Sequence, residues 1–204
     1  LETTGALKQL KVLETAEGIS GPYCGKLMAG LGADVIKIEP PHGDSARQTG
    51  PFPNDIPDPE ASGLFLYLNT GKRSVTLDLE HESDTVLKMV QDVDVVIENY
   101  PPGKLASLGL GYDDMARVNP SVLVVSITPF GQHGPYRDFE SSDIVVHALS
   151  GELYLAGRPE REPLKKGGNL SEYHGGLNGH LSVMAALYAR QTTGRGQHID
   201  VSLL

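Results

Sequence analysis

Short runs rich in β-branched residues alternate with stretches of helical periodicity along this sequence, and that alternation most constrains its fold. Strands are expected over 10–14, 34–39, 74–79, 94–98, 122–127 and 197–202. Several of these runs are apolar at consecutive positions, which is typical of strands that helices cover on both faces. The pattern predicts an α/β fold, a Rossmann-like parallel sheet flanked by helices.

The helical stretches lie between these runs, and the longest is near the end of the chain. Helices are expected over 21–31, 82–91, 142–150 and 176–191. In the last range Leu177, Leu181 and Tyr188 recur on one helical face, and the glycine-rich residues 192–196 end the pattern. Residues 40–67 are rich in Pro, Gly and Asp and are expected to form one long loop, a kind that is more often functional than idle.

The charge balance and the single cysteine argue against several classes of function. The chain has 17 Lys and Arg residues against 26 Asp and Glu residues, a net charge of -9, which disfavours nucleic acid and anionic membrane surfaces as partners. With Cys24 alone, no internal disulfide or multi-cysteine metal site can form, and Cys24 is expected to be a buried apolar residue. No apolar run approaches the ~20 residues that span a bilayer. The first ten residues do not resemble a signal peptide, so a cytoplasmic location is expected.

Two nucleotide-binding motifs are suggested by the first half of the chain, and neither fits. The segment TAEGISGP, between the first strand and the first helix, lacks the G-x-G-x-x-G fingerprint of a nicotinamide dehydrogenase. The segment GKRS precedes a strand, and Leu66 stands where a P-loop has its first glycine. Lys72 and Arg73 are still candidates to meet phosphates, and the competing interpretation is a solvated turn.

Glu172 is the candidate catalytic residue because it lies in a glycine-rich segment, GGNLSEYHGGLNG, directly before the longest predicted helix. A carboxylate there faces unpaired helix N–H groups, which stabilise its ionised form. Gly175 and Gly176 would let a ligand approach the backbone closely. The competing interpretation is an acid that only caps the helix. The histidines lack metal-ligand spacing, so no metal site is predicted.

Five segments, in order along almost the whole chain, resemble the class III CoA-transferases, the family that includes formyl-CoA transferase and the carnitine CoA-transferases. They are LKVLETAEGISGPYCGKLMAGLGADVIKIEPPHGD, LNTGKRSVTLDL, ENYPPGKLASLGLGYDD, SITPFGQHGPYRD and TTGRGQHIDVSLL. The first is similar to the family's opening strand, Gly-Pro turn and helix, and the last to its T-G-R-G-Q junction. The resemblance implies that residues 1–204 are the N-terminal, CoA-binding domain of a longer chain.

The resemblance implies transfer of CoA between carboxylic acids, with an acyl-CoA and an acceptor acid as substrates and no tightly bound cofactor. In the family an aspartate attacks the thioester and forms a mixed anhydride, and a glycine-rich loop shields the intermediates from water. Counted back from the T-G-R-G motif, the position of that nucleophile holds Glu172, and Gly176 stands at the family's glycine four residues on. The resemblance also implies an interlocked homodimer for the full-length protein.

The resemblance assigns the CoA contacts to a short set of residues: Ile19, Ser20, Lys72, Arg73, Asn99, Tyr100 and Lys104. Three positions depart from the family pattern, which usually has a glutamine at the position of Ile19, often a basic residue at that of Pro40, and an arginine at that of Ser107. Together with Glu172 in place of aspartate, they leave a second interpretation open, a CoA-binding domain that does not catalyse. Ser142 occupies the place of the acid/base histidine of the family's racemase branch, which argues against an acyl-CoA racemase.

Overall fold

A parallel sheet of six strands forms the centre of the structure, a computed structural model that describes residues 5–204. The strands are β1 (Lys11–Glu14), β2 (Asp34–Glu39), β3 (Arg73–Thr76), β4 (Val95–Glu98), β5 (Leu123–Thr128) and β6 (Gln197–Ser202). Every neighbouring pair is parallel, and the order across the sheet is β3-β2-β1-β4-β5-β6. This is the strand order of a Rossmann fold, and it confirms the predicted α/β class.

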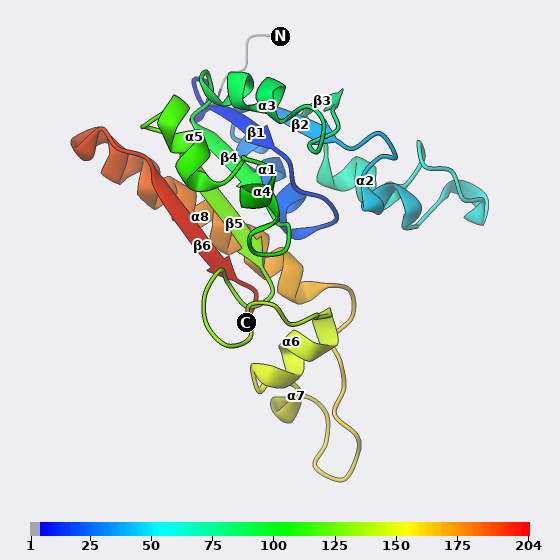
Figure 1. The fold of residues 1–204 in the computed structure, drawn as a ribbon. Helices are drawn as coiled ribbons and strands as arrows, with labels where there is room; N and C mark the ends of the chain where they lie inside the picture. The colour runs from blue at the N-terminus through cyan, green and yellow to red at the C-terminus, as the bar shows by residue number, and fades with distance from the viewer. Residues whose placement is uncertain (1–4) are drawn as a thin grey trace.

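Helices cover both faces of this sheet (Figure 1). They are α1 (Ser20–Gly30), α2 (Gly63–Leu68), α3 (Ser83–Val90), α4 (Lys104–Ser107), α5 (Tyr112–Val118), α6 (Asp143–Leu149), α7 (Glu152–Leu155) and α8 (Leu170–Thr193). α1 and α8 pack against each other and share one hydrophobic core with the sheet, while α3 and α5 belong to a second core on the opposite face. The sheet therefore separates two cores.

These two cores explain why the strands are apolar at consecutive positions. In β1, Val12 belongs to the core with Cys24 of α1, whereas Leu13 belongs to the core with Val86 of α3. Side chains alternate between faces along a strand, so a strand covered on both faces needs apolar residues throughout. Cys24 is fully buried, as predicted, and burial raises the pKa of its thiol far above the usual range.

The segment over residues 40–67 differs from the single long loop that the sequence predicts. It contains two 3-10 turns, Ser45–Gln48 and Pro53–Asp55, and most of α2. The buried Ser62 sets the start of α2, because its hydroxyl oxygen accepts a hydrogen bond from the N–H of Phe65 (3.1 Å). This local cap explains why a helix begins at Gly63 inside a segment that is rich in Pro and Gly.

Between β5 and α8 the chain leaves the sheet and forms an arm, residues 143–168, that contains α6 and α7 (Figure 1). The outer end of the arm has little cover, since Tyr154 and Leu155 of α7 are 91% and 83% exposed. None of the helices in residues 5–204 is both long and apolar enough to cross a membrane. The base of the arm lies next to the first turn of α8, where the candidate site begins.

Candidate active site

The carboxyl ends of β1 and β4 lie side by side where the strand order reverses, the position at which open parallel sheets bind ligands. Asn99 follows β4, and its side chain forms hydrogen bonds with the loop after β1. Its side-chain amide donates to the carbonyl of Glu17 (2.7 Å), and its side-chain oxygen accepts from the N–H of Glu17 (3.0 Å). The same amide lies 3.2 Å from the hydroxyl of Ser20. Two of the predicted CoA contacts, Asn99 and Ser20, are thus adjacent.

Glu172 reaches the same place from α8. Helix α1 begins at Ser20, after Ile19, and has no side-chain cap within its own sequence. The backbone N–H groups of Ser20 and Ile19, among the donors that the start of a helix leaves unpaired, act on the Glu172 carboxylate and favour its ionised form. The carboxylate therefore occupies the kind of position at which Rossmann folds bind phosphate.

Opposing effects set the protonation of Glu172. Burial raises the pKa of its carboxyl above the usual range, and the hydrogen bonds from Ser20 and Ile19 offset only part of that rise. The negative charge of Asp143 raises the pKa further. A partly desolvated carboxylate held by two donors is suited to nucleophilic attack.

The glycines beside Glu172 pack two helices together and do not form a loop. α8 begins at Leu170, not at residue 176 as predicted, so Glu172 lies in its first turn. Gly175 and Gly176 are buried inside this helix, and a Cβ on Gly176 would overlap the carbonyl oxygen of Ser20. These residues therefore do not form a loop before the helix, and their part in the approach of a ligand stays a prediction. The missing side chains instead let α8 carry Glu172 up against the start of α1.

Asp143 is a buried carboxylate at the start of α6 whose charge acts on Glu172. Its Oδ1 accepts hydrogen bonds from the N–H (3.0 Å) and the hydroxyl (2.6 Å) of Ser171, and the ammonium of Lys165 lies 2.5 Å from its Oδ2. Burial favours a higher pKa, but the hydrogen bonds from Lys165 and Ser171 outweigh it and hold the pKa of Asp143 below its usual range. Asp143 belongs to no motif in the sequence, and its available signal is that of an acid at the start of a predicted helix.

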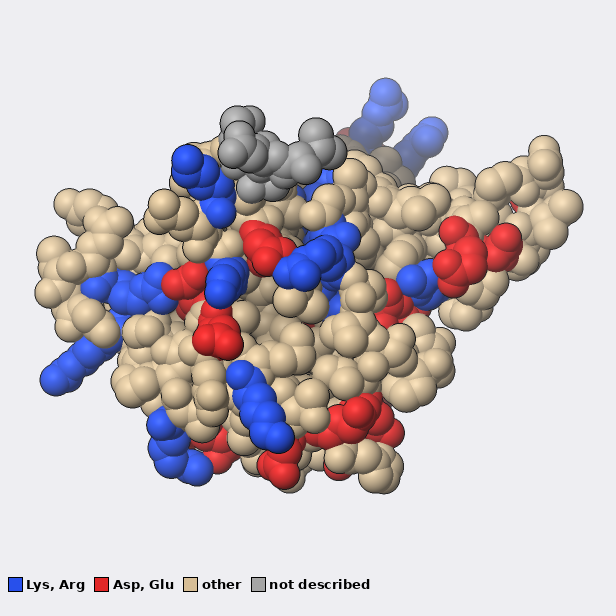
Figure 2. Space-filling view, turned by 90° about the horizontal axis from the view of Figure 1, so that it is seen from above, with Lys and Arg blue, Asp and Glu red and all other residues tan. Residues whose placement is uncertain are grey.

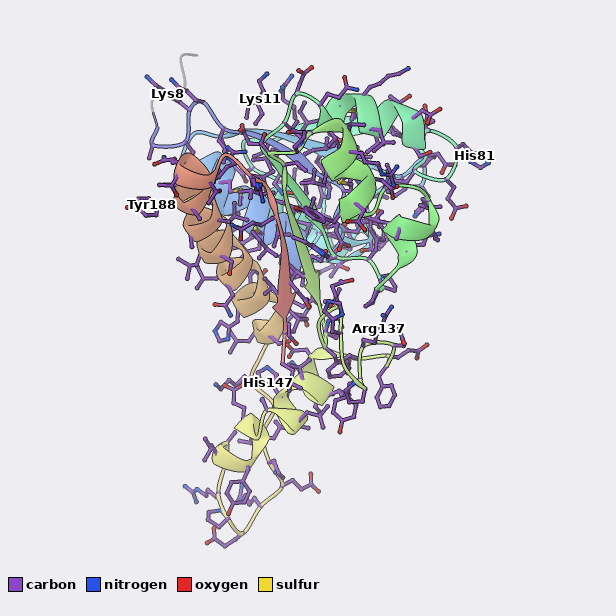
Figure 3. The ribbon with its side chains drawn as sticks, turned by 60° about the vertical axis from the view of Figure 1, so that its left-hand side comes forward. Lys8, Lys11, His81, Arg137, His147 and Tyr188 are labelled. Atoms are coloured by element: carbon purple, nitrogen blue, oxygen red, sulfur yellow. The ribbon has the colours of Figure 1, made fainter. Side chains whose placement is uncertain are left out.

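His147 connects the arm to this cluster, at the place where the arm joins the body of the molecule (Figure 3). It is buried, its Nδ1 contacts a carboxylate oxygen of Glu152, and its Nε2 lies 3.4 Å from Oδ2 of Asp143. The cluster thereby fixes Ser171, the residue before Glu172. Over residues 5–204, no three His, Cys, Asp or Glu side chains gather in a way that could hold a metal ion.

A cleft of about 620 Å³ opens next to Asn99 and contains two further predicted CoA contacts, Tyr100 and Lys104. The other lining residues are Glu17, Pro40, Pro41, His42, Asp78, Leu79, Glu80, Leu105 and Leu108. Burial raises the pKa of the Tyr100 phenol, so the ring presents a neutral hydroxyl. The Nζ of Lys104 lies 2.6 Å from a carboxylate oxygen of Glu80. This ion pair engages the ammonium group that a phosphate of a ligand would otherwise contact.

Lys72 and Arg73 are adjacent in the sequence, but their side chains point to different places: one is buried beside Glu14 and the other pairs with Asp34 at the surface. The Lys72 side chain is 2% exposed and lies 2.8 Å from Oε2 of Glu14, and burial lowers its pKa to about 8. Arg73 begins β3 and pairs with Asp34 (2.6 Å). That pair is at the edge where the strands begin, and basic and acidic side chains intermingle on this edge (Figure 2). The structure does not bring this pair of residues to the cleft.

Comparisons with known proteins are consistent with this geometry. The model of CoA-transferase family III matches residues 7–204. The chain is 39% identical over 203 residues to the acetyl-CoA:oxalate CoA-transferase of Acetobacter aceti, a match that covers 98% of this chain and 51% of that protein. It is 38% identical to the succinate–glutarate CoA-transferase of Agrobacterium fabrum, with 97% of this chain and 51% of that protein covered.

A solved structure is similar over the same extent. The crystal structure of a CaiB/BaiF family protein from Brucella suis superposes with a TM-score of 0.90 at 38% identity, covering 98% of this chain and 53% of that one. The chain thus spans about half the length of the relatives it matches. Because the family model matches residues 7–204 and a relative 39% identical covers 98% of the chain, the chain belongs to CoA-transferase family III.

Proposed function

We propose that the full-length protein transfers CoA between carboxylic acids and that Glu172 of this chain carries the acyl group covalently. The observation that carries the proposal is the position of the half-buried Glu172 at the start of α1, where the N–H groups of Ser20 and Ile19 favour its ionised form, beside Asn99. Membership of the family, and relatives named for oxalate and glutarate, support a carboxylic acid as the acceptor.

In the proposed reaction, an oxygen of the ionised Glu172 carboxylate attacks the thioester carbonyl of an acyl-CoA and expels the CoA thiolate, which leaves a mixed anhydride. The thiolate attacks the Glu172 carbonyl of this anhydride, releases the donor acid and forms an enzyme–CoA thioester. The acceptor carboxylate attacks that thioester and expels the thiolate again. The thiolate then attacks the acceptor carbonyl, which restores Glu172 and forms the new acyl-CoA. No electrons are gained or lost, so the reaction needs no redox cofactor.

We assign the CoA to the cleft next to Asn99. Tyr100 offers an aromatic ring to the adenine or the pantetheine, and Lys104 is the one Lys or Arg among the lining residues, so it is the candidate contact for a phosphate. The backbone of Ile19 and Ser20 supports the thioester end, because it lies between Asn99 and Glu172. In this assignment Arg73 makes no contact with CoA.

The second candidate function is CoA binding without catalysis. Two observations favour it. Glu172 stands where the resemblance implies an aspartate, and its carboxylate acts as a cap for α1. The cleft also carries three carboxylates, those of Glu17, Asp78 and Glu80, which repel the phosphates of CoA. From the resemblance, we also propose an interlocked homodimer in the cytoplasm for the full-length protein.

Assays of transfer and of binding on the full-length protein separate the two functions. The protein is incubated with acetyl-CoA and a panel of carboxylic acids, newly formed acyl-CoA is measured, and CoA affinity is determined by calorimetry. Transfer that disappears in Glu172→Gln, with CoA affinity retained, is the expected result. CoA affinity without transfer for any donor and acceptor supports the binding domain. No CoA affinity contradicts both functions.

A further inference from the structure

Four charged side chains are buried together beneath the loop that joins β1 to α1. They are Glu14, Lys37, Asp44 and Lys72, each with a side chain at most 2% exposed, and they are called the buried charge quartet here. The Nζ of Lys37 lies 2.7 Å from Oδ2 of Asp44 and 3.2 Å from Oε1 of Glu14. The Nζ of Lys72 lies 2.8 Å from Oε2 of Glu14. Two acids and two bases balance, so the quartet adds no net charge to the interior.

Stability alone does not account for this quartet. The loss of hydration on burying two charges is comparable to what their attraction returns, and apolar residues of similar volume often stabilise a protein as well or better. The quartet does not bind a ligand in the cleft either, since its members are absent from the cleft lining. The quartet does, however, hydrogen-bond to backbone groups of the loop that joins β1 to α1 and of the first turn of α1.

Lys37 and Asp44 hold the backbone of the loop between β1 and α1. The Lys37 ammonium donates a hydrogen bond to the carbonyl oxygen of Ala16 (2.7 Å), and Oδ1 of Asp44 accepts one from the N–H of Gly18 (3.0 Å). Gly18 has a φ of 71°, in the left-handed region that glycine adopts without strain. The loop thus turns at Gly18 in a conformation that Asp44 fixes, one residue before Ile19.

Lys72 holds the same loop from the other side. Its ammonium donates to the carbonyl oxygen of Pro22 (2.8 Å), in the first turn of α1. Residues 19 and 20 therefore lie between two anchored points, Gly18 and Pro22. Helix α8 packs against this stretch, with Gly176 next to the carbonyl oxygen of Ser20, and the N–H groups of residues 19 and 20 act on the carboxylate of Glu172 one turn earlier in that helix.

We propose that Lys37 and Asp44 are positioning residues for Glu172, because through Ala16 and Gly18 they set the direction of the N–H groups that hold its carboxylate. The inference rests on the proposed function of Glu172 as the acyl carrier. In this account Lys72 acts on the loop and not on a phosphate. The alternative is that the quartet contributes to stability only.

The test titrates the carboxyl carbon of Glu172 by NMR in the full-length protein, with Glu172→Gln to assign the signal. Asp44→Ala removes both the ion pair with Lys37 and the acceptor for the Gly18 N–H. Asp44→Asn removes the charge but keeps an acceptor, and Lys37→Met removes the donor to Ala16. These variants separate loss of charge from loss of the loop contacts.

The control variant is Asp94→Asn, which breaks the ion pair between Asp94 and Arg190 (2.8 Å) at the edge where the strands begin. It removes an ion pair, less buried than those of the quartet, without touching the loop. The other group whose charge acts on Glu172 is Asp143 of α6, and the charge of Glu172 in turn raises the pKa of Tyr173 of α8, which also faces Tyr23 of α1. The signal of Asp143 is followed in the same spectra, so that a change in its ionisation is not mistaken for an effect of the loop.

Asp44→Ala and Lys37→Met are expected to raise the titration midpoint of Glu172 by about one pH unit, the scale expected when a carboxylate loses hydrogen-bond donors. Asp44→Asn is expected to raise it less, and Asp94→Asn to leave it unchanged while lowering the melting temperature. A midpoint equal to that of the wild type in folded Asp44→Ala and Lys37→Met overturns the proposal.

A second measurement decides the question if neither of those two variants folds. Amide hydrogen exchange at Ile19 and Ser20 in Asp44→Asn is then expected to be faster than in the wild type, and unchanged exchange overturns the proposal. The titration is independent of turnover. A wild-type protein that forms no acyl adduct contradicts the proposed function, whereas the midpoints still decide whether Lys37 and Asp44 position Glu172.

Discussion

The backbone N–H of Ser20, the first residue of α1, acts on the carboxylate of Glu172 in the first turn of α8 and favours its ionised form. One turn further along α8, Gly176 lies against the carbonyl oxygen of the same serine. The start of α1 is therefore held at two points by α8. Because one of these points involves the carboxylate that we propose as the nucleophile, a change at this junction is expected to alter its protonation and its reactivity together.

The pH dependence of the reaction is expected to follow the ionisation of Glu172. Activity falls as the pH drops through its raised pKa, because the nucleophile must be ionised. The charge of Asp143 opposes that ionisation, so Asp143→Asn is expected to move the acid limb of kcat/KM to lower pH. Asp138→Asn changes an exposed acid, 75% exposed, and should leave the limb in place. A limb that stays put or moves to higher pH in Asp143→Asn contradicts this prediction.

Glu80 is expected to weaken CoA binding because it already pairs with Lys104 in the cleft. Glu80→Gln should tighten the Kd for CoA by about two- to five-fold, the scale of an exposed ion pair. Lys104→Ala should weaken binding and reduce its salt dependence. Adding Glu80→Gln to Lys104→Ala should then give no gain in a calorimetric titration.

Arg117→Gln is the matched control for these cleft variants. It breaks the exposed pair between Arg117 and Asp114 (2.5 Å), which does not line the cleft. The Kd for CoA should not change in this variant. A gain in affinity from Glu80→Gln that persists without Lys104 would show that Glu80 acts on the ligand directly and not by occupying the lysine.

Gly176→Ala is expected to destabilise the protein by about 1–3 kcal/mol, the usual range for overpacking, because the added Cβ overlaps a backbone carbonyl of α1. Gly30→Ala is the control, since nothing lies within 4 Å of a Cβ at that helical position. It should be neutral or slightly stabilising, as alanine favours a helix. Free energies of unfolding from urea titrations test both. Equal effects of the two substitutions would contradict the close packing of α1 and α8.

The sheet could be predicted because its signal is local. The central strands β1, β4 and β5 are buried on both faces, so apolar residues follow one another in their sequences, and all six expected strands are present in the fold. The start of α8 differs from its prediction, because the sequence predicts a helix from residue 176 and the observed helix begins at Leu170. Gly175 and Gly176 disfavour a helix when only propensity is considered, whereas the contact with α1 requires residues without side chains there.

The site could be predicted only in part because its contacts join distant segments. The resemblance indicated Glu172, Asn99 and Ser20, which the structure brings together. The partner of Lys72 is Glu14, 58 residues earlier, and no local pattern predicts such a buried pair. Neighbouring side chains at a strand also point to opposite sides, so two adjacent cations do not necessarily share a ligand.

Glu98 is expected to make the protein less stable as the pH rises. Burial raises its pKa from 4.5 to about 7, so the folded state keeps a proton that the unfolded state has released, and stability falls through that window. Glu98→Gln removes this titration and keeps an oxygen for the N–H of Tyr100, which lies 2.8 Å from the carboxylate. Between about pH 4.5 and pH 7, unfolding free energy should drop in the wild type relative to the variant. Parallel pH profiles would contradict the prediction.

The most direct measurement is whether an acyl-CoA leaves a covalent mark on Glu172. The full-length protein is incubated with acetyl-CoA and hydroxylamine, digested, and mapped by mass spectrometry. The account predicts a hydroxylamine-dependent change confined to the peptide that contains Glu172, absent from Glu172→Gln and retained in Glu160→Gln, which alters an exposed acid of the arm. A protein that transfers CoA while this peptide stays unmodified, or that carries the adduct on another residue, would contradict the central claim.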